Sequence, residues 1–302
     1  MREAVERWAI KRAVNVMRAL LAREPTPERF RRLLALAAPL LARRESFDAS
    51  VPFAIGDAGA RWIRPAGSAS GAVILYLHGG GFVASAPTLY ESFVAALSRE
   101  AGGRGLMLDY RLAPEHPFPA ALEDCFAAWE FLLSSGVDPA RIVIAGDSAG
   151  GNLVVNTAMR ARDEGLPQPA ALLLISPLLD LTFSGESVRR NDGFDPMFRA
   201  ASLHRLLDYY GTGLDPREPR LSPLFGRLTG LPPAMVLAGS SEVLLDDALR
   251  FAARVPGART AVWHDLPHVF PVFRGLTAGD RAIREMADFI RARTADATAG
   301  TA

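Results

Sequence analysis

The sequence predicts an α/β fold: a mostly parallel central sheet flanked by helices, with a helical cap over one end. Short apolar runs alternate with helix-like segments along most of the chain. These runs are hydrophobic almost throughout, as expected of strands that helices cover on both faces. With 302 residues, 49% of them hydrophobic, the chain can bury a large core in one α/β domain or two smaller ones.

Residues 1–45 predict two helices. Apolar residues recur near one face of the first helix, and we expect that face to be packed: Val5, Trp8, Val14, Met17 and Leu21. Pro25 and Pro27 break the pattern, with Thr26 as the N-cap of the second helix and Pro27 at its first position.

A hairpin and then a strand–helix alternation follow. Apolar residues at 51–55 and 60–63 predict two short strands, joined by a Gly-Asp-Ala-Gly turn. Six apolar runs predict the main strands: 73–77, 106–108, 142–145, 172–175, 235–238 and 260–263. Helical patterns lie between and after them, at 88–99, 119–134, 148–164, 246–254 and 280–293. This alternation favours a mostly parallel sheet with crossover helices.

One connection is unusually long. Residues 181–233 contain no clear strand and one expected helix, at 202–210. Long inserts in compact domains are usually functional or disordered, and we expect this one to cover the active site. The expected organisation is an N-terminal cap segment (1–45), a core (46–180), a cap insertion (181–233) and the C-terminal part of the core (234–302).

Composition excludes several classes. A formal net charge of +1 gives no support for a nucleic acid or an anionic membrane as partner. Cys125 is the only cysteine, so the chain has no intramolecular disulfide and no cysteine zinc cluster, and we expect Cys125 to be buried in a helix. No apolar run reaches the roughly 20 residues that span a bilayer, and no signal peptide is evident, so we expect a cytoplasmic protein without a membrane span.

Ser148 is the candidate nucleophile. It lies in the run Gly-Asp-Ser-Ala-Gly at 146–150, between an expected strand and an expected helix. The flanking glycines allow a sharp turn that exposes the serine hydroxyl beside the free N–H groups of the helix. The pattern alone also fits a glycine-rich turn without chemistry. For Asp147, which adjoins the serine, we expect local hydrogen bonding.

A second glycine-rich segment follows the strand at 73–77. His78 is followed by Gly79, Gly80 and Gly81. Three glycines let backbone N–H groups turn toward one point, an arrangement that suits a developing oxyanion. We expect His78 to support this loop through hydrogen bonds rather than to act as a base.

A serine nucleophile needs a histidine base. On sheets with this nucleophile turn, the chain order is serine, acid, histidine. His268 follows the last expected strand and therefore lies at the same sheet edge as Ser148, with His264 as the second choice. The other histidines fail the order or precede any acid at a strand end: His78, His116 and His204.

The histidine in turn needs an orienting carboxylate. Glu242 is the first acidic residue after the strand at 235–238, so we expect it to be the acid, with Asp246 as the second choice. Asp246 and Asp247 come one turn later, where acidic residues commonly complement the N-terminal end of a helix.

These motifs resemble the hormone-sensitive-lipase-like family of α/β-hydrolase carboxylesterases. The His-Gly-Gly-Gly segment looks like that family's oxyanion motif, Gly-Asp-Ser-Ala-Gly matches its nucleophile elbow, and residues 109–120 (DYRLAPEHPFPA) are similar to its structural bracing segment. The resemblance implies the α/β-hydrolase fold, Ser148 as nucleophile and His268 as base. It also implies oxyanion N–H groups from Gly80, Gly81 and Ala149. Many members have aspartate where this chain has glutamate, and the family analogy allows a homodimer through the last strand.

The expected function is hydrolysis of short- to medium-chain acyl esters through an acyl-enzyme, with a small-molecule ester as substrate and no metal or organic cofactor. Two alternatives stay open at this point. The same triad serves amide or lactone hydrolysis, and a non-catalytic small-molecule receptor uses the same fold when the triad is lost.

Overall fold

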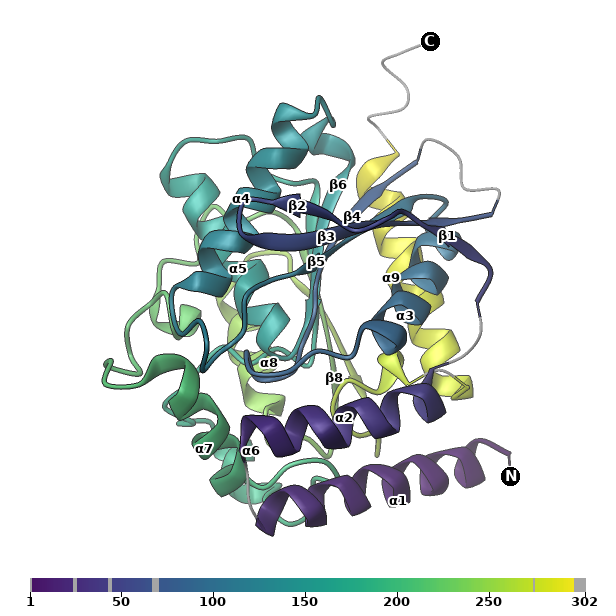
Figure 1. Ribbon diagram of the computed structural model, residues 1–302, viewed down its shortest axis with the longest axis vertical. Helices are drawn as coiled ribbons and strands as arrows, with labels where there is room; N and C mark the ends of the chain where they lie inside the picture. Colours follow the sequence, from purple (N-terminus) through teal and green to yellow (C-terminus); the bar gives the residue numbers. More distant parts are fainter. Residues whose placement is uncertain (1, 24–25, 43–44, 67–70, 274, 296–302) are drawn as a thin grey trace.

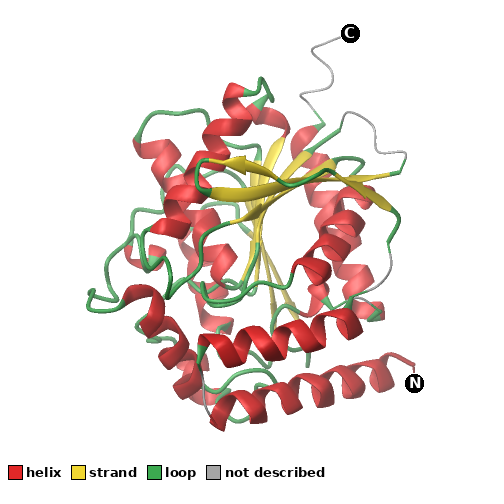
Figure 2. Ribbon diagram, in the orientation of Figure 1, coloured by secondary structure: helices red, strands yellow, loops and turns green. Residues whose placement is uncertain are grey.

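A computed structural model describes all residues except 1, 24–25, 43–44, 67–70, 274 and 296–302. A twisted sheet forms the middle layer, and helices cover both of its faces (Figures 1 and 2). The six apolar runs that predict the main strands all form strands, and the α/β-hydrolase prediction is confirmed. The last residues, 294–302, are small and polar and predict a frayed tail, of which residues 296–302 lie outside the described part of the chain.

The sheet has nine strands among the described residues. Its order is β1-β3-β5-β4-β6-β7-β8-β9, and β2 pairs with β3. The first three strands pair antiparallel, whereas β5, β4 and β6 to β9 are mutually parallel. The strand bounds are β1 Phe47–Ala49, β2 Phe53–Ile55, β3 Ala58–Pro65, β4 Val73–Leu77, β5 Arg104–Asp109, β6 Ile142–Asp147, β7 Ala171–Ile175, β8 Ala234–Gly239 and β9 Arg259–Trp263.

Helices α3 and α9 lie on one side of the sheet, and α4, α5 and α8 lie on the other (Figure 1). Strands β4, β6, β7 and β8 between these layers are buried along their whole length, which explains their uninterrupted apolar sequences. The helix bounds are α1 Arg2–Arg23, α2 Pro27–Leu41, α3 Pro87–Glu100, α4 Ala120–Ser134, α5 Ala149–Asp163, α6 Glu186–Arg190, α7 Ala200–Gly211, α8 Leu245–Arg254 and α9 Thr277–Thr294.

Several local features differ from the prediction. Strand β1 and the short helix α6 have no counterpart in the sequence analysis. The hairpin turn is tighter than expected, because Ile55 already pairs with Ala58 and only Gly56 and Asp57 form the turn. Gly56 has φ +57°, a conformation that costs glycine little. The capping prediction is confirmed, since the Thr26 side chain accepts a hydrogen bond from the N–H of Arg29.

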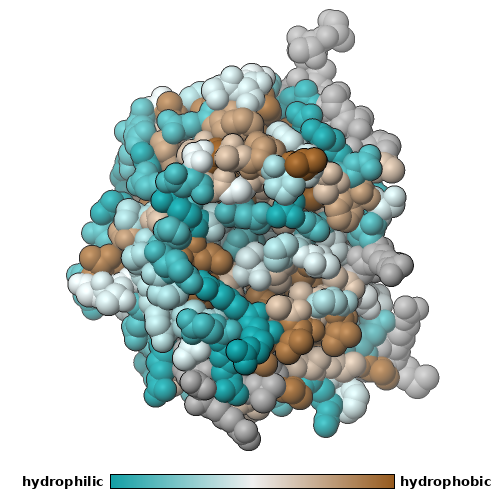
Figure 3. All heavy atoms as spheres, viewed as in Figure 1, coloured by the Kyte–Doolittle hydropathy of each residue, from teal (hydrophilic) through white to brown (hydrophobic). Residues whose placement is uncertain are grey.

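The packed face expected for α1 is wrong at Val5 and Trp8 but correct at Val14, while the side chains of Met17 and Leu21 lie outside the described part of the structure. Val5 and Trp8 are 59% and 61% exposed, whereas Ile10 and Val14 are buried. At 100° per residue Val5 and Val14 lie on opposite sides of a helix, so they cannot share the packed face. Hydrophobic side chains also gather on the surface in the lower part of Figure 3, where Figure 1 places α1 and α2.

Helices α1 and α2 lie across one end of the sheet, next to the segment that contains α6 and α7 (Figure 1). Strands β4 and β6 to β9 are parallel, so the loops after them meet at one edge of the sheet. The catalytic candidates lie on these loops. None of the helices in the described parts of the chain is long and apolar enough to cross a membrane.

Candidate active site

Ser148 lies at a strained turn between β6 and α5. Its φ of 52° and ψ of −120° are unusual for a residue with a side chain. Its N–H donates to the carbonyl of Ile175 (2.9 Å). A Cβ at Gly150 would lie 1.9 Å from the carbonyl oxygen of Leu77, so only glycine lets α5 start this close to β4. The turn therefore fixes the Ser148 hydroxyl at the edge of the sheet.

The loop after β4 also depends on glycine. Gly80 has φ +117°, and a Cβ there would lie 2.0 Å from the carbonyl oxygen of Ala84. Gly81 has φ +63°. Neither N–H group donates a hydrogen bond among the described residues. The backbone of this loop therefore offers donors beside the serine.

His78 has a structural environment. Its ring stacks on Tyr110 with 4.2 Å between ring centroids, and it also stacks on Tyr90. The Tyr110 hydroxyl donates to the His78 carbonyl (2.7 Å), and His78 Nδ1 lies 2.7 Å from the Gly79 carbonyl oxygen. Burial lowers the pKa of His78. The neutral ring thus packs against the glycine loop and supports it. Tyr110, the second residue of the DYRLAPEHPFPA segment, connects that segment to the loop.

Asp147, the residue before the nucleophile, connects the two loops. Its Oδ1 accepts hydrogen bonds from the Tyr76 hydroxyl (2.6 Å) and the Gly79 N–H (2.9 Å), and its Oδ2 accepts one from Tyr90 (3.3 Å). Burial raises the pKa of Asp147 to about 6, although these donors favour the charged form.

His268 and Glu242 form a buried pair. His268 Nδ1 lies 2.9 Å from Glu242 Oε2, and both side chains are almost fully inaccessible to solvent. His268 Nε2 is buried and has no hydrogen-bond partner in the part of the chain that the structure describes, so no hydrogen bond joins it to Ser148 there. Ser148 and His268 line the same cavity.

The environment of His268 favours its protonated form. Burial is the largest single influence and lowers its pKa, but the hydrogen bond and charge of Glu242 and the charges of Asp195 and Asp147 together outweigh burial. The net result is a raised pKa for His268. Such a ring accepts a proton readily.

Ser176, directly after β7, is a site residue that the sequence analysis missed. Its hydroxyl donates to Glu242 Oε1 (2.7 Å) and accepts from the N–H of Val269 (3.0 Å). The N–H of Gly239 also donates to Glu242 Oε1. Both oxygens of the Glu242 carboxylate therefore have partners. The Ser176 side chain links Glu242 to the loop that carries His268.

The second-choice acid and its neighbour have other partners. Asp246 accepts from the N–H of Ser187 (2.9 Å), and Asp247 accepts from the N–H groups of Leu179 and Asp180. His264, the second-choice base, is exposed. Neither Asp246 nor Asp247 forms a hydrogen bond with His268 among the described residues.

The cavity at Ser148 is small, about 50 Å³, and mostly apolar. Helix α2, the glycine loop, the segment 197–203 and the residues after His268 contribute to its walls. Its lining residues are Phe30, Leu34, Leu41, Gly80, Gly81, Leu89, Tyr90, Asp147, Ser148, Met197, Phe198, Leu203, His268, Val269, Val272 and Phe273. The ring of Phe198 contacts His268 edge-on, with 5.3 Å between centroids.

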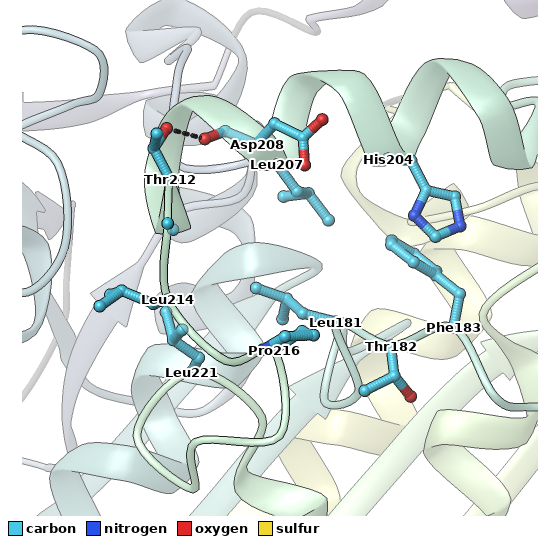
Figure 4. A pocket seen from close by; sticks show the side chains of 12 residues that line it. Leu181, Thr182, Phe183, His204, Leu207, Asp208, Thr212, Leu214, Pro216 and Leu221 are labelled. Atoms are coloured by element: carbon cyan, nitrogen blue, oxygen red, sulfur yellow. Dashed lines mark hydrogen bonds between the residues drawn. The ribbon is translucent and has the colours of Figure 1, made fainter.

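A larger cavity, about 410 Å³, lies around α7 and is separate from the catalytic candidates (Figure 4). His204 points into it beside Phe183, with 4.0 Å between ring centroids. No serine or cysteine lines it. Size alone would favour this cavity, but it lacks the serine turn with a neighbouring histidine–carboxylate pair, so we place the candidate active site at Ser148. Among the described residues, no group of three or more His, Cys, Asp or Glu side chains could hold a metal ion.

The chain is similar to known esterases in both sequence and fold. The model of a family described as having the alpha/beta hydrolase fold matches residues 74–272. An acetyl-hydrolase of Streptomyces hygroscopicus is 40% identical over 247 residues, which is 80% of this chain and 82% of that protein. A carboxylesterase/phospholipase of Mycobacterium tuberculosis is 37% identical over 77% of this chain and 65% of its own length. The crystal structure of an esterase from the bacterial hormone-sensitive lipase family superimposes with a TM-score of 0.91 at 36% identity, covering 96% of this chain and 98% of that one.

Proposed function

The chain belongs to the hormone-sensitive-lipase-like family of α/β-hydrolase carboxylesterases and is a carboxylic ester hydrolase. From this premise we propose that a triad of Ser148, His268 and Glu242 cleaves short- to medium-chain acyl esters. One observation carries the proposal. The Glu242 carboxylate binds one nitrogen of the His268 ring at 2.9 Å, while the other nitrogen is buried at the cavity that Ser148 lines. This arrangement supports a serine–histidine–acid triad, because catalytic hydrogen bonds are often long before substrate binds.

In the first step the Ser148 hydroxyl oxygen attacks the ester carbonyl carbon, and His268 Nε2 takes the hydroxyl proton. Glu242 holds Nδ1 as the protonated nitrogen and stabilises the imidazolium that forms. The raised pKa of His268 favours this proton transfer.

The negative charge develops on the former carbonyl oxygen. Gly80 and Gly81 line the cavity, and their N–H groups donate no hydrogen bond among the described residues. Ala149 is the first residue of α5, so its N–H has no acceptor within its own helix. We assign these three groups to the oxyanion. One such donor typically lowers the barrier by about 3–4 kcal/mol.

The intermediate then collapses. The bond from the carbonyl carbon to the alcohol oxygen breaks, and His268 gives its proton to the leaving alcohol. Water attacks the acyl-enzyme in the same way, with His268 as base, and releases the acid and the free Ser148 hydroxyl.

The small cavity supports a short acyl group. About 10–15 Å³ on this measure accommodates one water-sized group, so 50 Å³ holds a few heavy atoms without rearrangement. The name of the Streptomyces relative, acetyl-hydrolase, points the same way.

A hydrolysis panel tests the proposal. It contains p-nitrophenyl esters whose acyl chains have two to sixteen carbons. It also contains matched anilides, lactones and emulsified triglycerides. We expect kcat/KM to peak on short or medium p-nitrophenyl esters. A maximum on long-chain emulsions would contradict the chain length, a maximum on anilides or lactones would favour the amidase or lactonase alternative, and no turnover would favour the receptor.

Three sequence predictions stay predictions here. They are the assignment of 1–45 and 181–233 as a cap, the cytoplasmic location and the homodimer through the last strand. Within the described ranges, strand β9 pairs with β8 alone and is thus an edge strand. Light scattering after gel filtration measures the oligomeric state directly.

A further inference from the structure

The segment between β7 and β8 contacts the loop of the candidate acid directly. Asn191 Nδ2 donates to the carbonyl oxygens of Glu242 (2.7 Å) and Ser240 (3.2 Å). Asp195 Oδ2 accepts from the N–H of Val243 (2.9 Å). Two side chains from this insertion therefore fix the backbone on both sides of the Glu242 side chain.

Asp195 also shapes the cavity wall. Its Oδ1 accepts from the N–H groups of Met197 (2.7 Å) and Phe198 (3.1 Å), and both residues line the cavity at Ser148. Phe198 in turn contacts the ring of His268. One fully buried carboxylate thus joins the acid loop to the wall that packs against the base.

We propose that Asp195, together with Asn191, is a positioning residue for the reaction: it holds Glu242 and Phe198 in the places from which they orient His268. The inference rests on the proposed triad and deepens it. The proposal gives the insertion 181–233 a part in positioning the catalytic groups, in addition to covering the site.

The chemistry of the contacts supports this role. All three partners of the Asp195 side chain are N–H donors, so both oxygens must accept, and a carboxylate meets that demand. An asparagine would turn an amide NH₂ toward at least one of these donors and break that contact. Misplacement of a catalytic group by about 1 Å can cost about 100-fold in rate.

Asp195 also acts on His268 through its charge. The acidic groups that favour protonation of His268 are Glu242, Asp195 and Asp147. Loss of the Asp195 charge therefore lowers the pKa of His268. The acid limb of kcat/KM, which follows the protonation of the free enzyme's base, moves to lower pH.

The test compares Asp195→Asn, Asn191→Ala and a control, Asp180→Asn. Asp180 is an equally buried carboxylate just after β7, but its side chain accepts from Thr182, Ser184 and Arg250 instead of from the acid loop. The measurements are kcat and KM on p-nitrophenyl butyrate, the pH profile of kcat/KM, and the melting temperature.

For Asp195→Asn we expect kcat to fall about 10- to 100-fold and the acid limb to move to lower pH. Asn191 does not line the cavity, so Asn191→Ala should lower kcat with KM unchanged. Asp180→Asn should lower the melting temperature while kcat and the acid limb stay as in the wild type.

Two results would overturn the inference: an Asp195→Asn variant with wild-type kcat and acid limb, or equal kinetic losses in all three variants. A wild-type chain that neither hydrolyses the ester nor reacts with a fluorophosphonate would instead contradict the proposed function and remove the premise. The two failures are therefore distinguishable.

Discussion

The N–H of Gly79 donates a 2.9 Å hydrogen bond to Asp147 Oδ1, so the residue before the nucleophile holds the loop that carries the oxyanion donors. Asp147 is fully buried, and its other partners are the hydroxyl groups of Tyr76 and Tyr90. The nucleophile turn and the glycine loop thus form one unit, although 68 residues separate Gly79 from Asp147.

Substitutions of Asp147 test this link. Asp147→Ala leaves the Gly79 N–H without its acceptor, at a cost of about 1–3 kcal/mol for a buried donor, and we expect kcat/KM to fall about 100-fold as the loop shifts. Asp147→Asn retains an acceptor for Gly79 and places its amide beside the Tyr90 hydroxyl, which can accept. We expect it to keep activity within about tenfold of the wild type. Full activity in Asp147→Ala would refute the link.

The choice of acid is tested by two matched substitutions. Glu242→Gln removes the charge that fixes His268, and we expect kcat to fall about 10³- to 10⁴-fold. Asp246→Asn affects a side chain that accepts from the N–H of Ser187, so it should lose about 1 kcal/mol of unfolding free energy and little activity. Steady-state kinetics and thermal unfolding measure both effects. The reverse order of kinetic losses would assign the acid to Asp246.

The pH profile follows from the raised pKa of His268. The base must be neutral to take the Ser148 proton, so kcat/KM should fall as the pH decreases through the pKa of His268. Because that pKa is raised, the midpoint should lie above the ordinary histidine value of about 6.5. In Glu242→Gln the residual activity should have its acid midpoint at lower pH, since the charge of Glu242 no longer raises the pKa of His268 against the effect of burial. An acid limb that does not respond to this substitution would speak against the His268–Glu242 pair.

Much of the fold could be predicted from the sequence because its signals are local. Buried parallel strands have uninterrupted apolar runs, and glycines are needed where the backbone approaches β4 at Gly150 or Ala84 at Gly80. The order of motifs along the chain then placed Ser148, Glu242 and His268 at one sheet edge. The structure brings Glu242 and His268 into contact.

Other features depend on tertiary contacts that leave no local pattern. Ser176 and Glu242 are 66 residues apart, and Asp195 and Val243 are 48 apart, so nothing in the spacing pairs them. The outward position of Trp8 on α1 was equally unpredictable from apolarity, because the side chains of that helix that the structure describes as buried are Ile10 and Val14. An apolar residue on a peripheral helix does not show which side is covered.

The most direct measurement is turnover of p-nitrophenyl butyrate by the wild type and by Ser148→Ala, with fluorophosphonate labelling followed by intact mass. The account predicts that the wild type hydrolyses the ester and gains a single adduct on Ser148 as fluoride leaves. It predicts that Ser148→Ala folds normally, takes no label and loses about 10⁴- to 10⁶-fold in kcat. A folded Ser148→Ala variant with wild-type turnover would contradict the account.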